Sequence, residues 1–165
     1  MKKHWITFMV LVSGFVMAGC FKDIDTTFDE YRVVELETAV RTTPASGVSF
    51  PIVNVTRTTG AINNQVNLVG THLKAPEEMT FSVDTAISQL LNATTVRAVE
   101  GTHYNLNGGK FTFKADTSFA FLRFNILNPG ASTGRTALLV LKLDGNANIK
   151  PSENYRRVGY RINLN

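Results

Sequence analysis

The chain contains one cysteine, one tryptophan and little net charge, and each scarcity excludes a class of protein. Because Cys20 is the only cysteine among 165 residues, no disulfide can form within the chain, and a zinc site built from several thiolates is excluded. Lysine and arginine number 17 against 13 acidic residues, a formal charge of +4. Without Lys2 and Lys3 the charge falls to about +2, which is too mild for the clustered basic surface of a nucleic-acid-binding protein.

Long apolar runs are also lacking, and the one that exists stands at the N-terminus. Lys2 and Lys3 precede an apolar stretch that begins at Trp5, and small residues lead to Cys20. The stretch falls short of the ~20 apolar residues that cross a bilayer, so it predicts a secretion signal. Met17-Ala18-Gly19-Cys20 resembles the bacterial lipobox, in which a peptidase cuts before the cysteine and the thiol receives a diacylglyceryl group.

These features predict three parts: a lipoprotein signal peptide over residues 1–19, the lipidated Cys20 with a tether to residue 30, and a folded domain over residues 31–165. The alternative is an ordinary signal peptide beside an incidental cysteine. Asp23 and Asp25 in the tether resemble the surface-export signals of Bacteroidota lipoproteins, although a solvated linker explains them equally well. We therefore expect a lipid-anchored outer-membrane protein at the cell surface, with the periplasmic face as the alternative.

The rest of the sequence has the period-two pattern of β-strands. Residues 85–93 are compatible with a single helical turn, and Gly, Pro, Asn and Ser clusters separate the other segments. Strands are expected over residues 31–38, 48–56, 65–73, 79–84, 95–99, 111–114, 119–126, 136–143 and 155–164. The fold class is therefore all-β, a single antiparallel immunoglobulin-like β-sandwich of seven to nine strands.

The segment Glu100-Gly101-Thr102-His103-Tyr104 carries a family resemblance. With the strand pair that follows, it resembles small Bacteroidota lipoproteins of unknown function, which implies an immunoglobulin-like sandwich and a role beside outer-membrane glycan-uptake or attachment systems. It is also similar to a Calx-beta domain, but His103 stands where that pattern has an aspartate. Because Ca²⁺ prefers oxygen ligands, no metal or other cofactor is expected. We interpret the motif as structural, with Tyr104 burying its ring as in a tyrosine corner.

No signature of a catalytic site stands out, and candidate binding residues are few. The only tryptophan, Trp5, lies in the predicted signal, and the phenylalanines occupy alternating positions typical of a core. Tyr155 and Tyr160 therefore remain as candidate ligand-stacking residues. Asp84-Thr85-Ala86 resembles the O-glycosylation site of exported Bacteroidota proteins, which makes Thr85 a candidate modification site.

The sequence favours a non-catalytic binding module at the cell envelope, held to the membrane by its lipid. Its expected partner is a glycan or an outer-membrane protein, within a glycan-uptake system. The alternative is an accessory or anchor subunit of a fimbria-like assembly, in which an exposed sheet edge makes the contact. Pro51 blunts such an edge because it donates no ladder hydrogen bond. A small hydrolase or inhibitor is a third reading.

Overall fold

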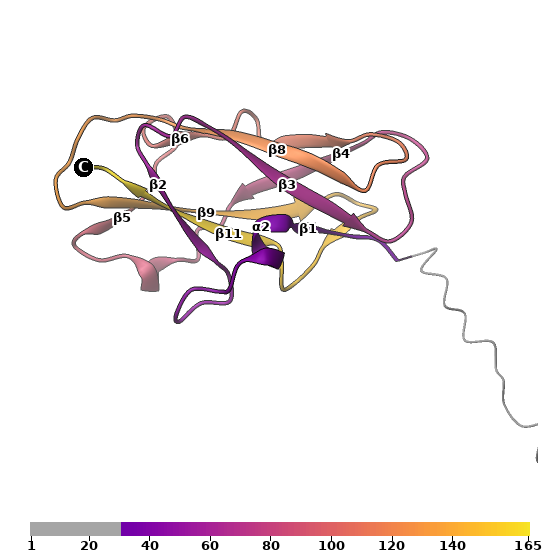
Figure 1. The fold of residues 1–165 in the computed structure, drawn as a ribbon, viewed down its shortest axis with the longest axis horizontal. Helices are drawn as coiled ribbons and strands as arrows, with labels where there is room; N and C mark the ends of the chain where they lie inside the picture. The colour runs from indigo at the N-terminus through magenta and orange to yellow at the C-terminus, as the bar shows by residue number, and fades with distance from the viewer. Residues whose placement is uncertain (1–30) are drawn as a thin grey trace, which may run out of the picture.

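The computed structural model describes residues 31–165, and the predicted signal peptide, Cys20 and the tether lie outside this range. Two packed β-sheets form a sandwich, with the short helix α2 at one side (Figure 1). The all-β sandwich predicted from strand periodicity is therefore confirmed. Eleven strands occur in the described part of the chain, beyond the predicted nine, because β6 and β10 are only two residues long each.

Sheet A has the strand order β10-β1-β3-β8-β6. Its strands are β10 (Lys150–Pro151), β1 (Val33–Leu36), β3 (Ala61–Val69), β8 (Phe119–Ile126) and β6 (Tyr104–Asn105). Sheet B has the order β2-β11-β9-β4-β7, and β5 also pairs with β9. Its strands are β2 (Ile52–Thr56), β11 (Arg157–Asn163), β9 (Thr136–Gly145), β4 (Glu77–Val83), β7 (Lys110–Phe113) and β5 (Thr95–Arg97).

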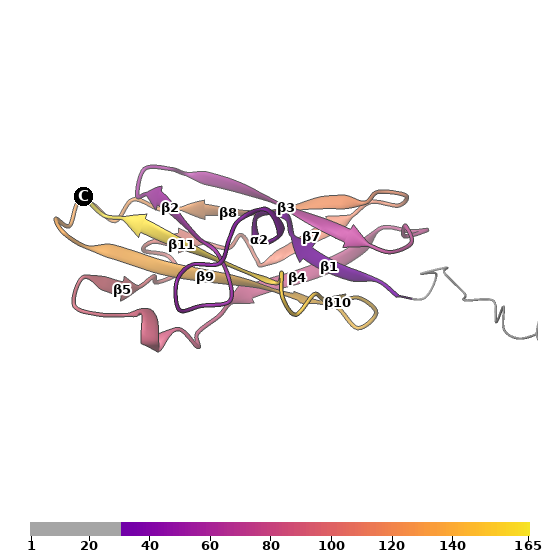
Figure 2. The ribbon, with the colours of Figure 1, turned by 60° about the horizontal axis from the view of Figure 1, so that its bottom comes forward.

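The pairing is not antiparallel throughout. Three pairs, β1 with β10, β2 with β11 and β5 with β9, run parallel, because the chain returns to these edges through loops and not through hairpins (Figure 2). Pro51 immediately precedes the edge strand β2, where its missing N–H costs no ladder bond, as predicted.

Several predicted strand boundaries are wrong by a few residues, and two of them change the course of the chain. The first strand ends at Leu36, and the chain turns into α2 (Glu37–Arg41), where Glu37 and Arg41 form an i,i+4 ion pair. β3 begins at Ala61, before the predicted start at residue 65, because cross-strand pairing with β8 overrides the weak strand propensity of this segment. The helical turn predicted over residues 85–93 is a 3₁₀ helix, η1 (Ser88–Leu90).

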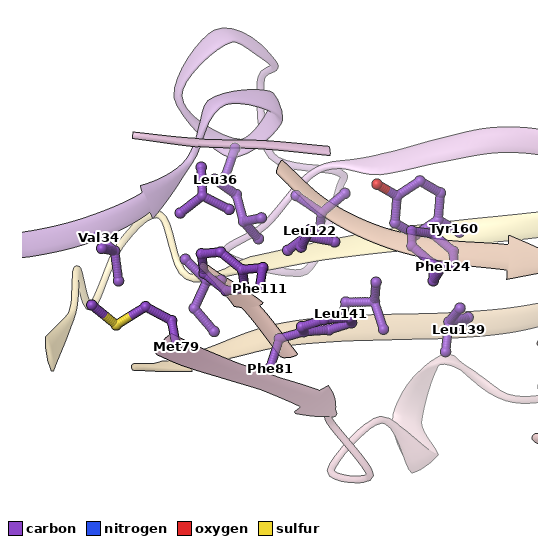
Figure 3. Packing of buried hydrophobic residues seen from close by; sticks show 14 of the residues in the cluster. Val34, Leu36, Met79, Phe81, Phe111, Leu122, Phe124, Leu139, Leu141 and Tyr160 are labelled. Atoms are coloured by element: carbon purple, nitrogen blue, oxygen red, sulfur yellow. The ribbon is translucent and has the colours of Figure 1, made fainter. Parts of the chain in front are cut away.

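The main core lies between the sheets and consists of the inward residues of each strand (Figure 3). One polar network crosses it. Thr38 Oγ1 donates to Asn64 Oδ1 at 2.8 Å, and Asn64 Nδ2 donates to the Tyr160 hydroxyl at 2.6 Å. The Tyr160 ring packs edge-on against Phe124 with centroids 5.0 Å apart. The network therefore ties α2 and sheet A to sheet B, and it satisfies the polar groups of the buried Asn64.

β9 is buried on both faces, as its nearly continuous apolar run predicts. Its residues Leu139 and Leu141 enter the main core, whereas Leu138 and Val140 point outward from sheet B. Phe50 and Ile87, from the loops before β2 and after β4, cover that outward pair and form a second, smaller core. We call it the outer core of sheet B.

Candidate functional site

The outward face of sheet A combines aromatic and polar side chains, and we call it the polar–aromatic face. It is built from β1, β3 and β8, whose residues alternate between the core and solvent. Its members are Glu35, Asn63, Gln65, Asn67, Phe119, Phe121 and Arg123.

Strand register places these side chains in rows across the sheet. Glu35 on β1 is opposite Asn67 on β3, and Asn67 is opposite Phe119 on β8. In the next row Gln65 is opposite Phe121. Since directly opposite residues have Cβ atoms about 5 Å apart, each phenylalanine has an amide as its nearest neighbour across the strand.

The two phenylalanines remain in contact with solvent. Phe119 is 49% exposed and Phe121 is 43% exposed. Their ring centroids are 5.8 Å apart and the ring planes meet at 78°. Because the ring planes are nearly perpendicular, the two rings do not form one flat surface. The edge of one ring points toward the face of the other.

Hydrogen bonds hold the amides of this face in place. Gln65 Nε2 donates to Asn67 Oδ1 at 2.9 Å, and Asn67 Nδ2 donates to Glu37 Oε2. Glu37 also pairs with Arg41 within α2. Polar groups fixed in this way lose less conformational entropy when a ligand binds.

Glu35 completes the polar side of the face. Partial burial and the neighbouring negative charge of Glu37 raise the pKa of the Glu35 carboxyl above its usual value. Both effects disfavour the ionised form. A carboxylate in this position gains from ligand hydroxyl groups that donate to it, since hydrogen bonding stabilises the charged form.

The sequence prediction placed these phenylalanines in the core, and for Phe119 and Phe121 that is wrong. The prediction that they share one strand face is correct, because they are two residues apart. The sequence of β8 indicated which face is inward. The even-numbered residues of β8 are all apolar, and they are buried: Ala120, Leu122, Phe124 and Ile126. Phe119 and Phe121 lie on the other face, together with the polar residues Arg123 and Asn125.

The two predicted ligand-stacking tyrosines are not brought together. Tyr160 is only 4% exposed and its hydroxyl accepts from Asn64, so its ring has no free face for a ligand, and the prediction for this residue is corrected. Tyr155 is 39% exposed. It borders a cavity of about 490 Å³, together with Val40, Pro44 and Pro51.

Thr85, the candidate O-glycosylation site, is exposed directly after β4. Asp84 has a structural role there: its Oδ1 accepts from the Ala86 N–H at 2.9 Å, and its Oδ2 pairs with Arg157 at 3.3 Å. Arg97 Nη1 donates to the Thr85 carbonyl at 2.9 Å. These bonds fix the backbone around Thr85, and modification of its hydroxyl remains a prediction.

The Glu100–Tyr104 motif forms a turn that leads into β6. Gly101 has a φ of +79°, which suits glycine, and the Val99 N–H donates to His103 Nδ1 at 3.1 Å. Burial lowers the pKa of His103 and raises that of Tyr104, whose ring is buried. The predicted burial of the Tyr104 ring is confirmed.

Two further features of residues 31–165 concern ligands and membranes. Within this range no group of three or more His, Cys, Asp and Glu side chains is arranged to hold a metal ion. The helices described here are all too short and polar to cross a membrane.

Solved structures share this architecture at low sequence identity. An apo-form Calx CBD1 domain matches with a TM-score of 0.54 and 11% identity, over 81% of this chain and 99% of that one. A protein of unknown function from Bacteroides ovatus matches with a TM-score of 0.54 and 20% identity, over 82% of this chain and 45% of that one. These likenesses show a Calx-beta-like sandwich fold.

A third structure has a name that concerns binding. It is a "putative carbohydrate binding protein" from Bacteroides ovatus, with a TM-score of 0.54 and 8% identity over 80% of this chain and 37% of that one. The chain thus spans less than half of either Bacteroides ovatus protein. No family model and no curated protein matches the sequence.

Proposed function

We propose that this chain is a non-catalytic glycan-binding module of the cell envelope and that the polar–aromatic face is its binding surface. The single observation that carries the proposal is the half-exposed pair Phe119 and Phe121, in edge-to-face contact and bordered by amides. Sugar rings have an apolar C–H face and a rim of hydroxyl groups. An aromatic ring beside amides and a carboxylate complements both.

The energetics favour a ligand on this face. Full burial of a phenylalanine side chain stabilises a fold by about 2 kcal/mol, and about half of that gain is lost for each of these two half-exposed rings. Single exposed apolar residues such as Val69 on the same face are ordinary, but an adjacent pair of aromatic rings bordered by amides is not. A sugar stacked on either ring removes apolar surface from water while the amides meet its hydroxyl groups.

The cellular setting is part of the same proposal. Lipidation at Cys20 would hold the domain at the outer membrane, and a glycan-uptake system is the setting we favour. The fold likeness to the Bacteroides ovatus protein supports a binding role. O-glycosylation at Thr85 is a separate prediction: an intact mass of the secreted protein that is unmodified apart from the lipid would refute it.

The test is a glycan microarray probed with the full chain purified in detergent. We expect retention on a defined set of glycans and about a tenfold loss of affinity in Phe121→Ala, which corresponds to about 1.4 kcal/mol of binding free energy. Phe121→Trp should retain binding, because it keeps an aromatic face. Tyr155→Ala is the matched control, since it removes an exposed aromatic ring outside the face.

Two outcomes would contradict the proposal. One is the absence of any retained glycan. The other is equal retention by wild type and by a Phe119→Ala, Phe121→Ala double variant. Co-purification of a pilin-like protein, with no glycan signal, would instead favour the fimbria-like alternative. Loss of binding in Tyr155→Ala alone would move the site to the cavity beside α2.

A further inference from the structure

A second polar surface lies on the opposite sheet, and it is rich in arginine. A groove of about 260 Å³ opens on the outer side of sheet B, where β2 and β11 end and β9 begins. Its lining includes Arg135 and Arg161, with Asn54, Thr136, Asn163 and Asn165, whose main-chain oxygen accepts from Arg57 Nε at 3.1 Å. We call it the arginine groove. It is separate from the polar–aromatic face because it lies on the other sheet.

Strand register explains why these residues meet. Asn54 on β2 is opposite Arg161 on β11, and Asn163 is opposite Thr136 on β9. Arg161 and Asn163 point outward because Ile162 between them is buried in the main core. The loop that carries Arg135 is held against the end of β11, where the Leu164 N–H donates to the Arg135 carbonyl at 3.1 Å.

Both guanidinium groups are exposed and unpaired. Within residues 31–165, the side chains of Arg135 and Arg161 make no hydrogen bond or ion pair, and no aspartate or glutamate lines the groove. Asn163 uses its amide oxygen to accept from the Asn165 N–H at 2.9 Å, so its NH₂ donors are still available. The groove therefore presents positive charge and amide donors together.

The remainder of the same outer face has a different charge pattern. Glu78 pairs with Lys110 at 2.8 Å, Asp144 pairs with Lys142 at 3.4 Å, and the carboxylate of Asp84 pairs with an arginine. Cations are thus neutralised along this sheet wherever an acid is present. Among the described residues of that face, Arg97 on β5 also lacks an acidic partner but donates to the Thr85 carbonyl at 2.9 Å, whereas no bond is described for the side chains of Arg135 and Arg161.

We propose that the arginine groove binds an oxyanion: a carboxylate, sulfate or phosphate group carried by a polar ligand. Guanidinium groups bind oxyanions through paired, charge-assisted N–H···O bonds. The amides of Asn54 and Asn163 then suit the hydroxyl groups around such an anion. This site is additional to the glycan face and does not depend on it.

The position of the groove suits access from outside. Figure 1 shows that the C-terminal end of the sandwich, where β11 ends, lies opposite the end at which residue 31 enters the fold. If the chain is tethered through its N-terminal segment, the groove is at the end of the domain farthest from the tether. A ligand can then approach it without crossing the membrane surface.

The test compares four sugars that share one ring: glucuronate, glucose 6-sulfate, glucose 6-phosphate and uncharged glucose. Binding to the full chain in detergent is measured by calorimetry at low ionic strength. We expect at least one charged sugar to bind about tenfold more tightly than glucose, and to weaken as salt is added. The charged sugar that binds identifies which oxyanion the groove takes.

Variants localise the effect. Arg161→Gln and Arg135→Gln should each remove most of the preference for the charged sugar, and Arg161→Lys should restore part of it, because lysine keeps the charge without the paired donors. Lys114→Gln is the matched control: it removes another exposed cation without a described side-chain partner, outside both the arginine groove and the polar–aromatic face. Thermal unfolding of each variant checks that it is folded.

Two results would overturn the proposal: no charged sugar binds better than glucose, or Lys114→Gln weakens binding as much as Arg161→Gln. The second result would mean that net charge, and not the groove, attracts the anion. Failure here is distinguishable from failure of the glycan face, since Phe121→Ala should leave the oxyanion preference intact.

Discussion

Outward-pointing apolar side chains are buried on sheet B and exposed to solvent on sheet A. On sheet B, Leu138 and Val140 point outward but are fully covered by Phe50 and Ile87 from neighbouring loops. On sheet A, Phe119 and Phe121 also point outward, and no described segment covers them. The chain thus has loops that cover one outward apolar pair and leaves the other in water, which is the pattern expected when an external ligand is the cover.

The largest expected effect on the free energy of unfolding comes from truncating a residue of the outer core of sheet B. Leu138→Ala should lower the free energy of unfolding by about 3 kcal/mol, because it leaves a cavity in the outer core of sheet B. Phe121→Ala should lower it by less than about 1 kcal/mol, since the ring is half exposed. Urea unfolding of both variants measures the difference, and equal losses would show that Phe121 has a structural role.

The next effect concerns the polar network that joins the sheets. Asn64→Ala should cost about 2 kcal/mol of unfolding free energy, because it removes partners from both Thr38 and Tyr160. Tyr160→Phe should cost about 1 kcal/mol, since only one hydrogen bond is lost. Glycan binding by the folded Tyr160→Phe variant should match wild type, and a specific loss of binding would return Tyr160 to the site.

A smaller effect on the free energy of unfolding is expected for Arg157, which holds the loops against the outer face of sheet B. Arg157 pairs with Asp84 at 3.3 Å, donates to Ser49 Oγ at 3.1 Å and lies 5.2 Å above the centre of the Phe50 ring. Arg157→Met should lower the unfolding free energy by about 1 kcal/mol. Arg157→Lys should lose less, because the charge remains. High salt should shrink the difference between wild type and Arg157→Met.

The smallest effect is a pH dependence on the side of sheet A. Burial lowers the pKa of His103 in the fold, and Nδ1 accepts a hydrogen bond only when it carries no proton. Because the unfolded chain keeps the higher pKa, this stabilisation is present above about pH 6.5 and is lost as the pH falls through the folded pKa. His103→Gln, which does not titrate, should remove that part of the pH profile of the unfolding free energy. An unchanged profile would contradict the assignment.

Two pairs of phenylalanines show what residue spacing can predict and what it cannot. Phe111 and Phe113 on β7 and Phe119 and Phe121 on β8 have the same spacing, yet the first pair is buried and the second is exposed. Spacing predicts that each pair shares a face, because side chains alternate along a strand. Which face meets the core depends on the neighbouring positions, and in β8 the four apolar alternate residues occupy the core.

Both candidate surfaces depend on register, which the sequence left open. The rows Glu35–Asn67–Phe119 and Asn54–Arg161 join strands that are far apart in the chain. Tyr160 shows the same limit: it was predicted as a ligand-stacking residue, but it is buried and bonded to Asn64 on the other sheet. Local patterns include no information about which distant strand becomes the neighbour.

The sequence by itself determined the all-β class, the sets of residues that share a face of each strand and the central place of β9, because these follow from period-two alternation and continuous apolar runs. The N-terminal pattern likewise predicts a secretion signal and lipidation at Cys20. Tertiary structure alone decided that Phe119 and Phe121 face water, that Tyr160 is locked in the core, and that Arg135 and Arg161 border one groove. The physical reason is that burial and charge pairing depend on contacts between segments that only sheet pairing brings together.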